Sequence, residues 1–289
     1  MDFAHIQQCS CKIPGSEKMQ LATVSWPLGV NNVDTMMAHA AALRLPGVQY
    51  CGDPRQCPAE RVKRAAAAHN IRIIAIDPLD CAPPRASQAT PDQAIAFYHT
   101  LVDYARDTGS GALTLQGLSQ WTKQAANTQA AYAQLVECVR EVAAYAQEQG
   151  VSLLYEVCNH YEVPLIHTAQ ACLAMLDEVG SDAIRIILDS FHMNINEPSP
   201  VQAILAVGDR LGMYHISDSN RAGIGSGNID FLAQYRALKQ IGFSGDVAIE
   251  LVLPHLTPMT PPQTESDRRR LDAEIRRSAA VWQALAIER

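Results

Sequence analysis

Four side chains that can bind a metal ion end four apolar segments in the second half of the sequence: Glu156, Asp189, His215 and Glu250. An unpaired carboxylate is costly to bury, so these acids do not extend apolar strands for stability alone. At the mouth of a barrel or parallel sheet, strand ends meet a ligand or a metal. Taken singly, each acid can be read as a salt-bridged strand end, and the histidine as a buried core residue. Their coincidence predicts one shared metal site.

The donor set limits the choice of ion. Three carboxylates and one imidazole suit a borderline-hard divalent cation. The set contains no thiolate, which argues against a structural zinc site. We expect Mn²⁺, with Co²⁺, Mg²⁺ and Zn²⁺ as alternatives.

The segments that lead to these residues have the composition of buried parallel strands. Residues 184–188 read Ile-Arg-Ile-Ile-Leu, an apolar run without alternation that is typical of a strand covered on both faces. Residues 151–155, 211–214 and 246–249 run in the same way into Glu156, His215 and Glu250. The site is therefore expected at the carboxyl ends of neighbouring strands.

Strands and helices alternate along the whole chain. The expected strands are residues 21–26, 48–51, 71–76, 112–115, 151–155, 184–188, 211–214 and 246–249. The expected helices are residues 33–44, 58–69, 92–106, 120–149 with a break near Asn127, 168–179, 199–209, 230–241 and a last helix that ends near residue 287. Strict alternation predicts a parallel sheet, and eight repeats predict a (β/α)₈ TIM barrel.

We expect a single domain over residues 1–289, with residues 1–18 as an N-terminal extension. The rival architecture is an open doubly wound sheet. It would carry a glycine-rich phosphate-binding turn after the first strand, and Ser-Trp-Pro-Leu-Gly at residues 25–29 is not such a turn.

The composition of the chain argues against two classes of binding partner, nucleic acids and membranes. The net charge is -7 and there is no basic run, which argues against a nucleic-acid partner. No apolar stretch is long enough for a membrane span, and residues 1–18 lack an export signal, so we expect no membrane partner. The chain has 8 cysteines, several of them in helix or strand patterns, which suits reduced thiols and a cytoplasmic protein.

Four motifs resemble the D-tagatose/D-psicose (allulose) 3-epimerases, which belong to the xylose isomerase-like superfamily of metal-dependent TIM barrels. The motifs are Glu-Val-Cys-Asn-His-Tyr-Glu at residues 156–162, Leu-Asp-Ser-Phe-His-Met-Asn at 188–194, His-Ile-Ser-Asp-Ser-Asn-Arg at 215–221 and Ile-Glu at 249–250. The similarity runs over residues 151–251, and the first half shares only the alternation of strands and helices. Where the family often has Pro-Phe after the last glutamate, this chain has Leu251-Val252.

The resemblance implies epimerisation at carbon 3 of a free ketohexose-type sugar through a cis-enediolate. In an eight-stranded ring, the fifth and eighth strands place Glu156 and Glu250 on opposite sides of the mouth. One carboxylate would remove the proton beside the carbonyl, and the other would return a proton to the opposite face. The expected catalytic pair is therefore Glu156 and Glu250, both of which are also expected metal ligands.

Three further matches suit substrate binding. Arg221 carries a planar fork that would hold the enediolate oxygens. His192, three residues after Asp189, is expected to face the same pocket and hydrogen-bond a hydroxyl, and Glu162 matches the family's substrate-contacting glutamate. The resemblance also implies a homodimer or a homotetramer.

Two other functions stay open. A related isomerase of the hydroxypyruvate, inosose or keto-glycoside type would keep the same metal and carboxylates with a different pocket. A non-catalytic sugar-binding barrel is the second alternative. A zinc endonuclease of the superfamily would need histidines on the early strands, where residues 48–51 and 71–78 have none, and a basic face.

Overall fold

The protein forms a closed barrel of eight parallel strands in chain order, as predicted. The computed structural model describes residues 19–29, 32–78, 82–257, 260 and 262–287. The strands are β1 (Gln20–Val24), β2 (Gly47–Tyr50), β3 (Arg72–Ile76), β4 (Ala112–Thr114), β5 (Ser152–Glu156), β6 (Ile184–Asp189), β7 (Leu211–Ile216) and β8 (Asp246–Ile249). The barrel closes where β1 pairs with β8, with Gln20 opposite Asp246.

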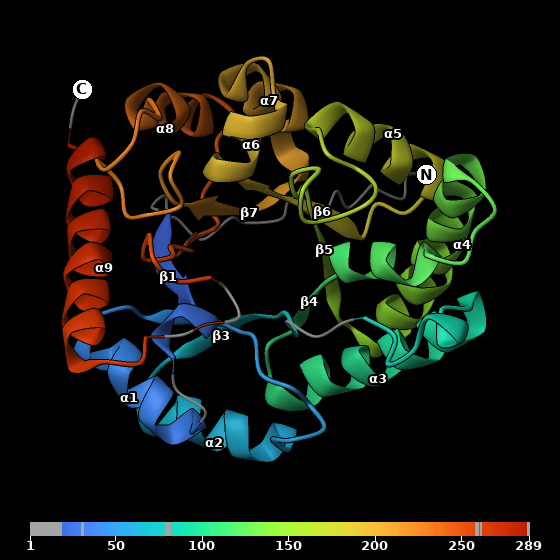
Figure 1. Ribbon diagram of the computed structural model, residues 1–289, viewed down its shortest axis with the longest axis horizontal. Coiled ribbons are helices and arrows are strands. Elements are labelled where there is room, and N and C mark those ends of the chain that lie inside the picture. Colours follow the sequence, from blue (N-terminus) through green and yellow to red (C-terminus); the bar gives the residue numbers. More distant parts are fainter. Residues whose placement is uncertain (1–18, 30–31, 79–81, 258–259, 261, 288–289) are drawn as a thin grey trace, which may run out of the picture.

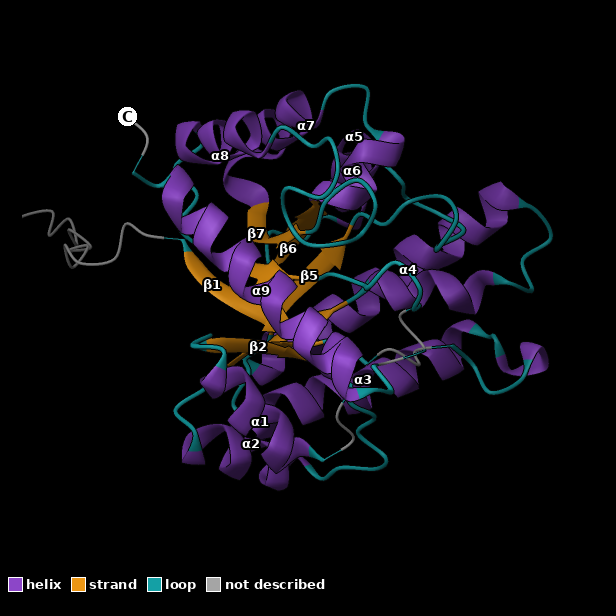
Figure 2. Ribbon diagram, turned by 60° about the vertical axis from the view of Figure 1, so that its left-hand side comes forward, coloured by secondary structure: helices purple, strands orange, loops and turns teal. Residues whose placement is uncertain are grey.

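Helices surround the strands on the outside (Figure 1). They are α1 (Val33–Ala42), α2 (Ala59–Ala68), α3 (Pro91–Thr108), α4 (Thr128–Gln149), α5 (Ala169–Val179), α6 (Ser190–Asn196), α7 (Pro200–Val207), α8 (Phe231–Gln240) and α9 (Glu265–Leu285). A view turned by 60° shows the same enclosure from another side (Figure 2). The fold is thus the (β/α)₈ barrel expected from the sequence.

Helix starts follow from side chains that satisfy the first free backbone amides. Asn32 caps α1 by accepting hydrogen bonds from the amides of Asp34 and Thr35. Thr264 and Asp267 form a reciprocal capping box at the start of α9. These local signals explain why most expected helix boundaries agree with the structure to within one or two residues.

The break expected near Asn127 is present: a 3₁₀ helix, η3 (Gln116–Thr122), precedes α4, and Asn127 caps α4 by accepting from the amide of Ala130 at 2.9 Å. One helical segment differs from the prediction. Helix α6, directly after β6, was missed. Its seven residues are too few to show a helical period in the sequence.

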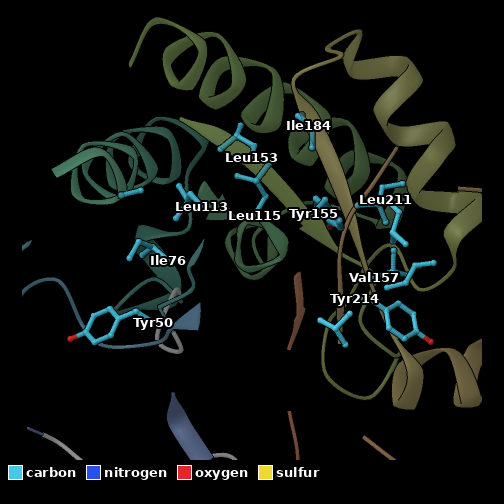
Figure 3. Close-up of a cluster of buried hydrophobic side chains, with 14 of the residues drawn as sticks. Tyr50, Ile76, Leu113, Leu115, Leu153, Tyr155, Val157, Ile184, Leu211 and Tyr214 are labelled. Atoms are coloured by element: carbon cyan, nitrogen blue, oxygen red, sulfur yellow. The ribbon is translucent and has the colours of Figure 1, made fainter. Parts of the chain in front are cut away.

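Alternate residues of each strand point to opposite sides of the barrel wall. Outward-facing side chains such as Leu153, Tyr155 and Tyr214 pack under the helices in the main core (Figure 3). Inward-facing side chains form a smaller cluster inside the barrel, which includes Leu154, Ile187, Met213 and Ala248. Each of these four residues is followed two positions later by a polar residue that faces the same interior: Glu156, Asp189, His215 and Glu250.

Three expectations from the sequence concern the N-terminal extension, the cysteines and the absence of a membrane span. The predicted extension, residues 1–18, lies outside them. Within the described part of the chain, Cys51, Cys57, Cys138, Cys158 and Cys172 are free. Among the described helices, none combines the length and the apolar character that a membrane span needs.

Candidate metal centre and active site

Glu156, Asp189, His215 and Glu250 converge at the carboxyl end of the barrel. Each follows an inward-facing apolar residue by two positions, so the strand period aims it at the interior. One ligand atom from each lies within 4.8 Å of the others, and all four residues are buried. The structure therefore brings together the four residues that the sequence grouped as metal ligands.

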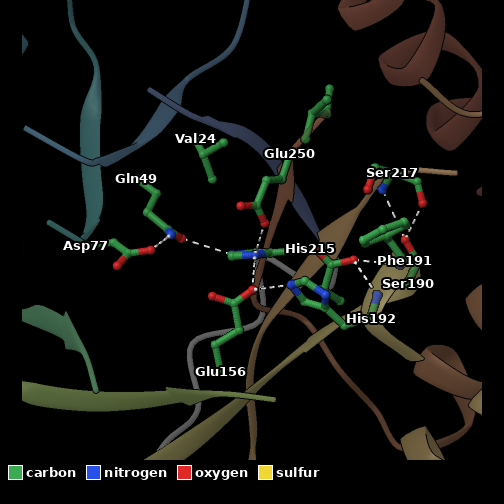
Figure 4. Close-up of polar contacts among 12 residues, drawn as sticks. Val24, Gln49, Asp77, Glu156, Ser190, Phe191, His192, His215, Ser217 and Glu250 are labelled. Carbon is green, nitrogen blue, oxygen red and sulfur yellow. Dashed lines mark hydrogen bonds and ion pairs between the residues drawn. The ribbon is translucent and has the colours of Figure 1, made fainter. Parts of the chain in front are cut away.

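His215 lies between the two glutamates (Figure 4). Its Nδ1 is 3.3 Å from Oε1 of Glu156 and 2.7 Å from Oε2 of Glu250. Its Nε2 is 2.9 Å from Oε1 of Gln49, on β2. The two carboxylates thus face the same ring nitrogen from different strands.

A chain of hydrogen bonds sets the tautomer of His215. The amide nitrogen of Gln49 donates to Oδ2 of Asp77 at 2.7 Å, so its oxygen is the atom turned toward the imidazole. That oxygen can only accept, which places the ring proton on Nε2. Nδ1 is then the nitrogen that faces the carboxylates, and without a proton it presents a lone pair, the form in which imidazole binds a metal.

The electrostatics of the cluster fit a divalent cation. Burial raises the pKa of Glu156 to about 8, with His215 opposing the rise and Glu250 adding to it. Burial acts to lower the pKa of His215, but Glu156 and Glu250 outweigh it and raise that pKa well above its ordinary value. Nδ1 of His215 and Oε2 of Glu250 are buried and make no hydrogen bond of good geometry with any described residue, although they lie 2.7 Å apart. These converging donors suit a divalent cation, which would replace the bound protons.

Asp189 is held in its ionised form. Burial acts to raise its pKa, but Arg221 and the nearby imidazoles outweigh burial and hold the pKa well below the usual range. Nη1 of Arg221 donates to Oδ2 at 2.8 Å, and the amide of Phe191 donates to Oδ1 at 2.6 Å. The same carboxylate therefore caps α6 and faces the metal site.

Arg221 bridges the expected ligands. Besides Asp189 it approaches Glu250, with Nη2 3.2 Å from Oε1, and its guanidinium lies 4.7 Å from the ring centre of Phe191. Its backbone has a positive φ of 62°, an uncommon conformation for a non-glycine residue. The loop after β7 must hold that conformation for the guanidinium to reach the site.

His192 and Glu162 lie beside Glu156. Nδ1 of His192 is 2.8 Å from the amide nitrogen of Asn159, so it accepts a hydrogen bond and Nε2 carries the proton. That Nε2 is 3.7 Å from Oε1 of Glu156 and 3.9 Å from Oε2 of Glu162. Burial lowers the pKa of His192 to about 4, so the ring is neutral and presents an N–H donor near neutral pH.

A cavity of about 230 Å³ opens over these side chains. Five of the seven expected site residues line it: Glu156, Glu162, His192, Arg221 and Glu250. Asp189 and His215 are fully buried. The indole of Trp26 donates to Oε1 of Glu250 at 3.3 Å. The space suits one small polar ligand in contact with both glutamates.

Sequence reasoning missed Gln49, Asp77, Thr114 and Gln116, at the ends of β2, β3 and β4. Asp77 was detectable, because it directly follows the apolar run of β3 just as Asp189 ends β6. It is partly buried, and burial raises its pKa while hydrogen bonds from Thr114 and Gln49 oppose that rise. Gln49 gave no comparable signal, since a glutamine inside a short strand has no characteristic spacing.

Residues 37–279 match the family model described as Xylose isomerase-like TIM barrel. The chain belongs to this family. The match covers most of the barrel, including every expected metal ligand.

Relatives with known names are sugar isomerases and epimerases. L-ribulose 3-epimerase of Methylomonas sp. (strain DH-1) is 41% identical over 115 residues, which are 40% of each chain. L-ribulose 3-epimerase of Mesorhizobium japonicum is 28% identical over 201 residues, 69% of this chain and 63% of the relative. D-psicose 3-epimerase of Ruminiclostridium cellulolyticum is 41% identical over 115 residues, 40% of this chain and 39% of the relative. The chain thus matches less than two thirds of the length of each of these relatives.

Solved structures agree in fold over nearly the whole chain. A structure of L-ribulose 3-epimerase superimposes with a TM-score of 0.77 at 23% identity, covering 92% of this chain and 94% of the other. D-psicose 3-epimerase with D-tagatose, from Clostridium cellulolyticum H10, gives 0.75 at 23% identity, covering 91% and 99%. At such identities the likeness establishes the barrel architecture.

Proposed function

We propose that this protein is a divalent-metal-dependent ketose 3-epimerase that acts on a free ketohexose-type sugar. The observation that carries the proposal is the placement of Glu156 and Glu250, which approach Nδ1 of His215 at 3.3 and 2.7 Å and both line one cavity. Relatives named ketose, D-psicose and L-ribulose 3-epimerases support the reaction type.

The metal would be held by Glu156, Asp189, His215 and Glu250, and we propose Mn²⁺. The chemistry that a bound cation supplies there is polarisation of the substrate carbonyl and stabilisation of developing negative charge. Proton transfer and substrate binding are assigned to the side chains around the metal.

Two carboxylates on different strands can serve opposite faces of one carbon. In the proposed reaction, one of Glu156 and Glu250 removes the proton from carbon 3, which leaves a cis-enediolate. The other returns a proton to the opposite face, so the carbon is inverted.

The neighbouring side chains would hold the substrate. Arg221 lies beside both Asp189 and Glu250, where its fork can bind the enediolate oxygens. The Nε2–H of His192 can donate to a substrate hydroxyl, and Glu162, which is half exposed, can accept from another. We propose a cytoplasmic location, which the free thiols in the described part of the chain support.

An inosose isomerase activity is the second candidate. Inosose isomerase of Bacillus subtilis is 26% identical over 151 residues, 48% of this chain and 54% of the relative. Such an enzyme would use the same metal and carboxylates on a cyclic polyol. Assaying the Mn²⁺-loaded protein with a panel of ketoses and with inosose separates the two candidates.

The decisive test replaces each proposed acid–base residue. Glu156→Gln and Glu250→Gln keep size and hydrogen bonding but cannot transfer a proton, so each should lose at least about 10²-fold in turnover. Glu148→Gln, on the exposed face of α4, is the matched control and should keep full turnover.

Solvent isotope exchange adds a second measurement. One of the two variants should still exchange the carbon-bound proton of the substrate with deuterated water without completing inversion. Near-normal turnover in both variants with metal bound would rule out the two-carboxylate mechanism.

A further inference from the structure

The cavity has a second polar side that the proposed reaction does not use. It is formed by Asp77, which follows β3, and Gln116, at the start of η3; both line the cavity. In Figure 4, Asp77 lies across His215 from His192. We call Asp77 and Gln116 the acceptor wall.

Asp77 is fixed by three donors. Its Oδ1 accepts from the hydroxyl of Thr114 at 2.7 Å and from the amide nitrogen of Gln116 at 3.1 Å. Its Oδ2 accepts from Gln49 at 2.7 Å. Three of the four lone-pair directions of a carboxylate are thus occupied, and the fourth remains for a ligand.

Gln116 is the unusual member of the wall. Its nitrogen is used by Asp77, which leaves its Oε1 turned away from that carboxylate. Oε1 is buried and has no hydrogen-bond partner among the described residues. A buried carbonyl oxygen without a donor is unfavourable, and such an atom at a cavity wall is suited to a donor from a ligand.

The charges of the cavity restrict that ligand. Among the described lining residues, Asp77, Glu156, Glu162 and Glu250 are acids, and Arg221, the one Arg or Lys side chain, is already paired with Asp189 and Glu250. A phosphate group would meet carboxylates without a free cation to bind it. Hydroxyl groups, in contrast, can donate to every acceptor on the wall.

We propose that Asp77 and Gln116 bind hydroxyl groups at the end of the sugar away from the reacting carbonyl. The wall thereby selects an unphosphorylated, fully hydroxylated chain over a deoxygenated or phosphorylated one. This assignment rests on the proposed function, because the two glutamates define which end of the sugar reacts.

The test is Gln116→Met, which keeps the length of the side chain and removes the acceptor Oε1. It also removes one donor to Asp77, which keeps its hydrogen bonds from Thr114 and Gln49. With the Mn²⁺-loaded full chain, KM for a ketohexose should rise about 2- to 12-fold, the range for one lost hydrogen bond, while kcat stays within about twofold. With at least one of the 6-deoxy and 4-deoxy ketohexoses as substrate, kcat/KM should be the same for Gln116→Met as for the unaltered protein. That sugar already lacks the hydroxyl that would donate to Gln116. Gln147→Met, on the exposed face of α4, is the matched control.

Calorimetry on the unaltered protein provides an independent measurement. The ketohexose should bind at least about threefold more tightly than one of the deoxy counterparts and than the 6-phosphate. If Gln116→Met lowers kcat/KM equally for every sugar, or does not lower it at all, the proposed role of the acceptor wall is wrong. Water would then be the donor to Oε1. If the protein binds ketohexoses with this selectivity but turns none over, the proposed function fails and the wall stands.

Discussion

His215 owes its orientation to residues on the other side of the barrel. Gln49 is 166 positions away in the sequence, yet its oxygen lies 2.9 Å from Nε2 and is itself oriented by Asp77. Groups that hydrogen-bond a metal ligand fix its tautomer and ring plane. Gln49 and Asp77 are therefore positioning residues for the proposed metal site.

We predict that Gln49→Leu weakens Mn²⁺ binding by about 10- to 100-fold, because the imidazole loses the acceptor that holds its proton on Nε2. Competition with a chelator measures the dissociation constant. Gln120→Leu is the control: it lines the same cavity but donates to the backbone of Glu162 and touches no proposed ligand. An unchanged dissociation constant in folded Gln49→Leu would contradict the role given to Gln49.

The second prediction at this scale concerns pH. The pKa of Glu156 is raised to about 8 in the folded, metal-free chain, so folding favours its protonated form. Stability from this group is present below its unfolded value of 4.5 and is lost as pH rises toward 8; the raised pKa of His215 acts in the same sense. Since metal replaces these protons, the stabilisation by one bound Mn²⁺ should grow with pH, by about 1.4 kcal/mol per pH unit per proton displaced.

Thermal unfolding between pH 6 and 8, with and without excess Mn²⁺, measures this effect, and metal analysis should give one ion per chain. Glu156→Gln, which cannot titrate, should show a smaller pH dependence of the metal-induced shift. A shift that is constant or falls with pH would count against proton displacement.

At the scale of elements, the loop after β7 decides where Arg221 points. Asp218 organises this loop: its carboxylate accepts from the amides of Ser219 and Gly225, both at 2.8 Å, and of Ile229 at 3.2 Å. Burial acts to raise the pKa of Asp218, but these backbone donors outweigh it and lower the pKa. The same loop holds the positive φ of Arg221.

We predict that Asp218→Ala lowers turnover by more than about tenfold and destabilises the fold by about 1–3 kcal/mol, because several backbone donors lose their partner. Asp182→Ala, at an exposed turn before β6, should leave both quantities unchanged. Denaturant unfolding and steady-state kinetics measure the two effects. If Asp218→Ala keeps its turnover while its stability falls, the loop stabilises the fold but does not position Arg221 for catalysis.

At the scale of the whole molecule, closure of the barrel makes the site. Pairing of β1 with β8 places Trp26 against Glu250, 224 positions apart in the sequence. Near the mouth, the side chain of Tyr161 is 80% exposed and lies against the ring of His160.

We predict a homodimer or a homotetramer, by resemblance to the family and because an exposed aromatic beside the mouth is a natural contact between copies. Sedimentation at micromolar concentration measures the state, and Tyr161→Asp should shift it toward smaller species. Glu148→Asp, on the exposed face of α4, is the control. A clean monomer of the unaltered chain would contradict this expectation.

Much of this architecture can be predicted from the sequence by itself. Buried parallel strands appear as apolar runs, and their alternation with helices determines the barrel. The acids and the histidine that end β5 to β8 are visible because a polar residue after an apolar run is locally unusual. Their predicted roles as ligands and catalysts await the experiments above.

Only the tertiary structure decided which atoms meet. The first half of the chain contributes Gln49, in β2, Asp77, after β3, and Gln116, after β4. These residues reach the site because the barrel closes, which no local pattern encodes. The pairing of Arg221 with Asp189 depends in the same way on one left-handed residue in a loop. Local sequence sets burial and periodicity over a few residues, whereas hydrogen bonds across the barrel depend on the position of every strand between them.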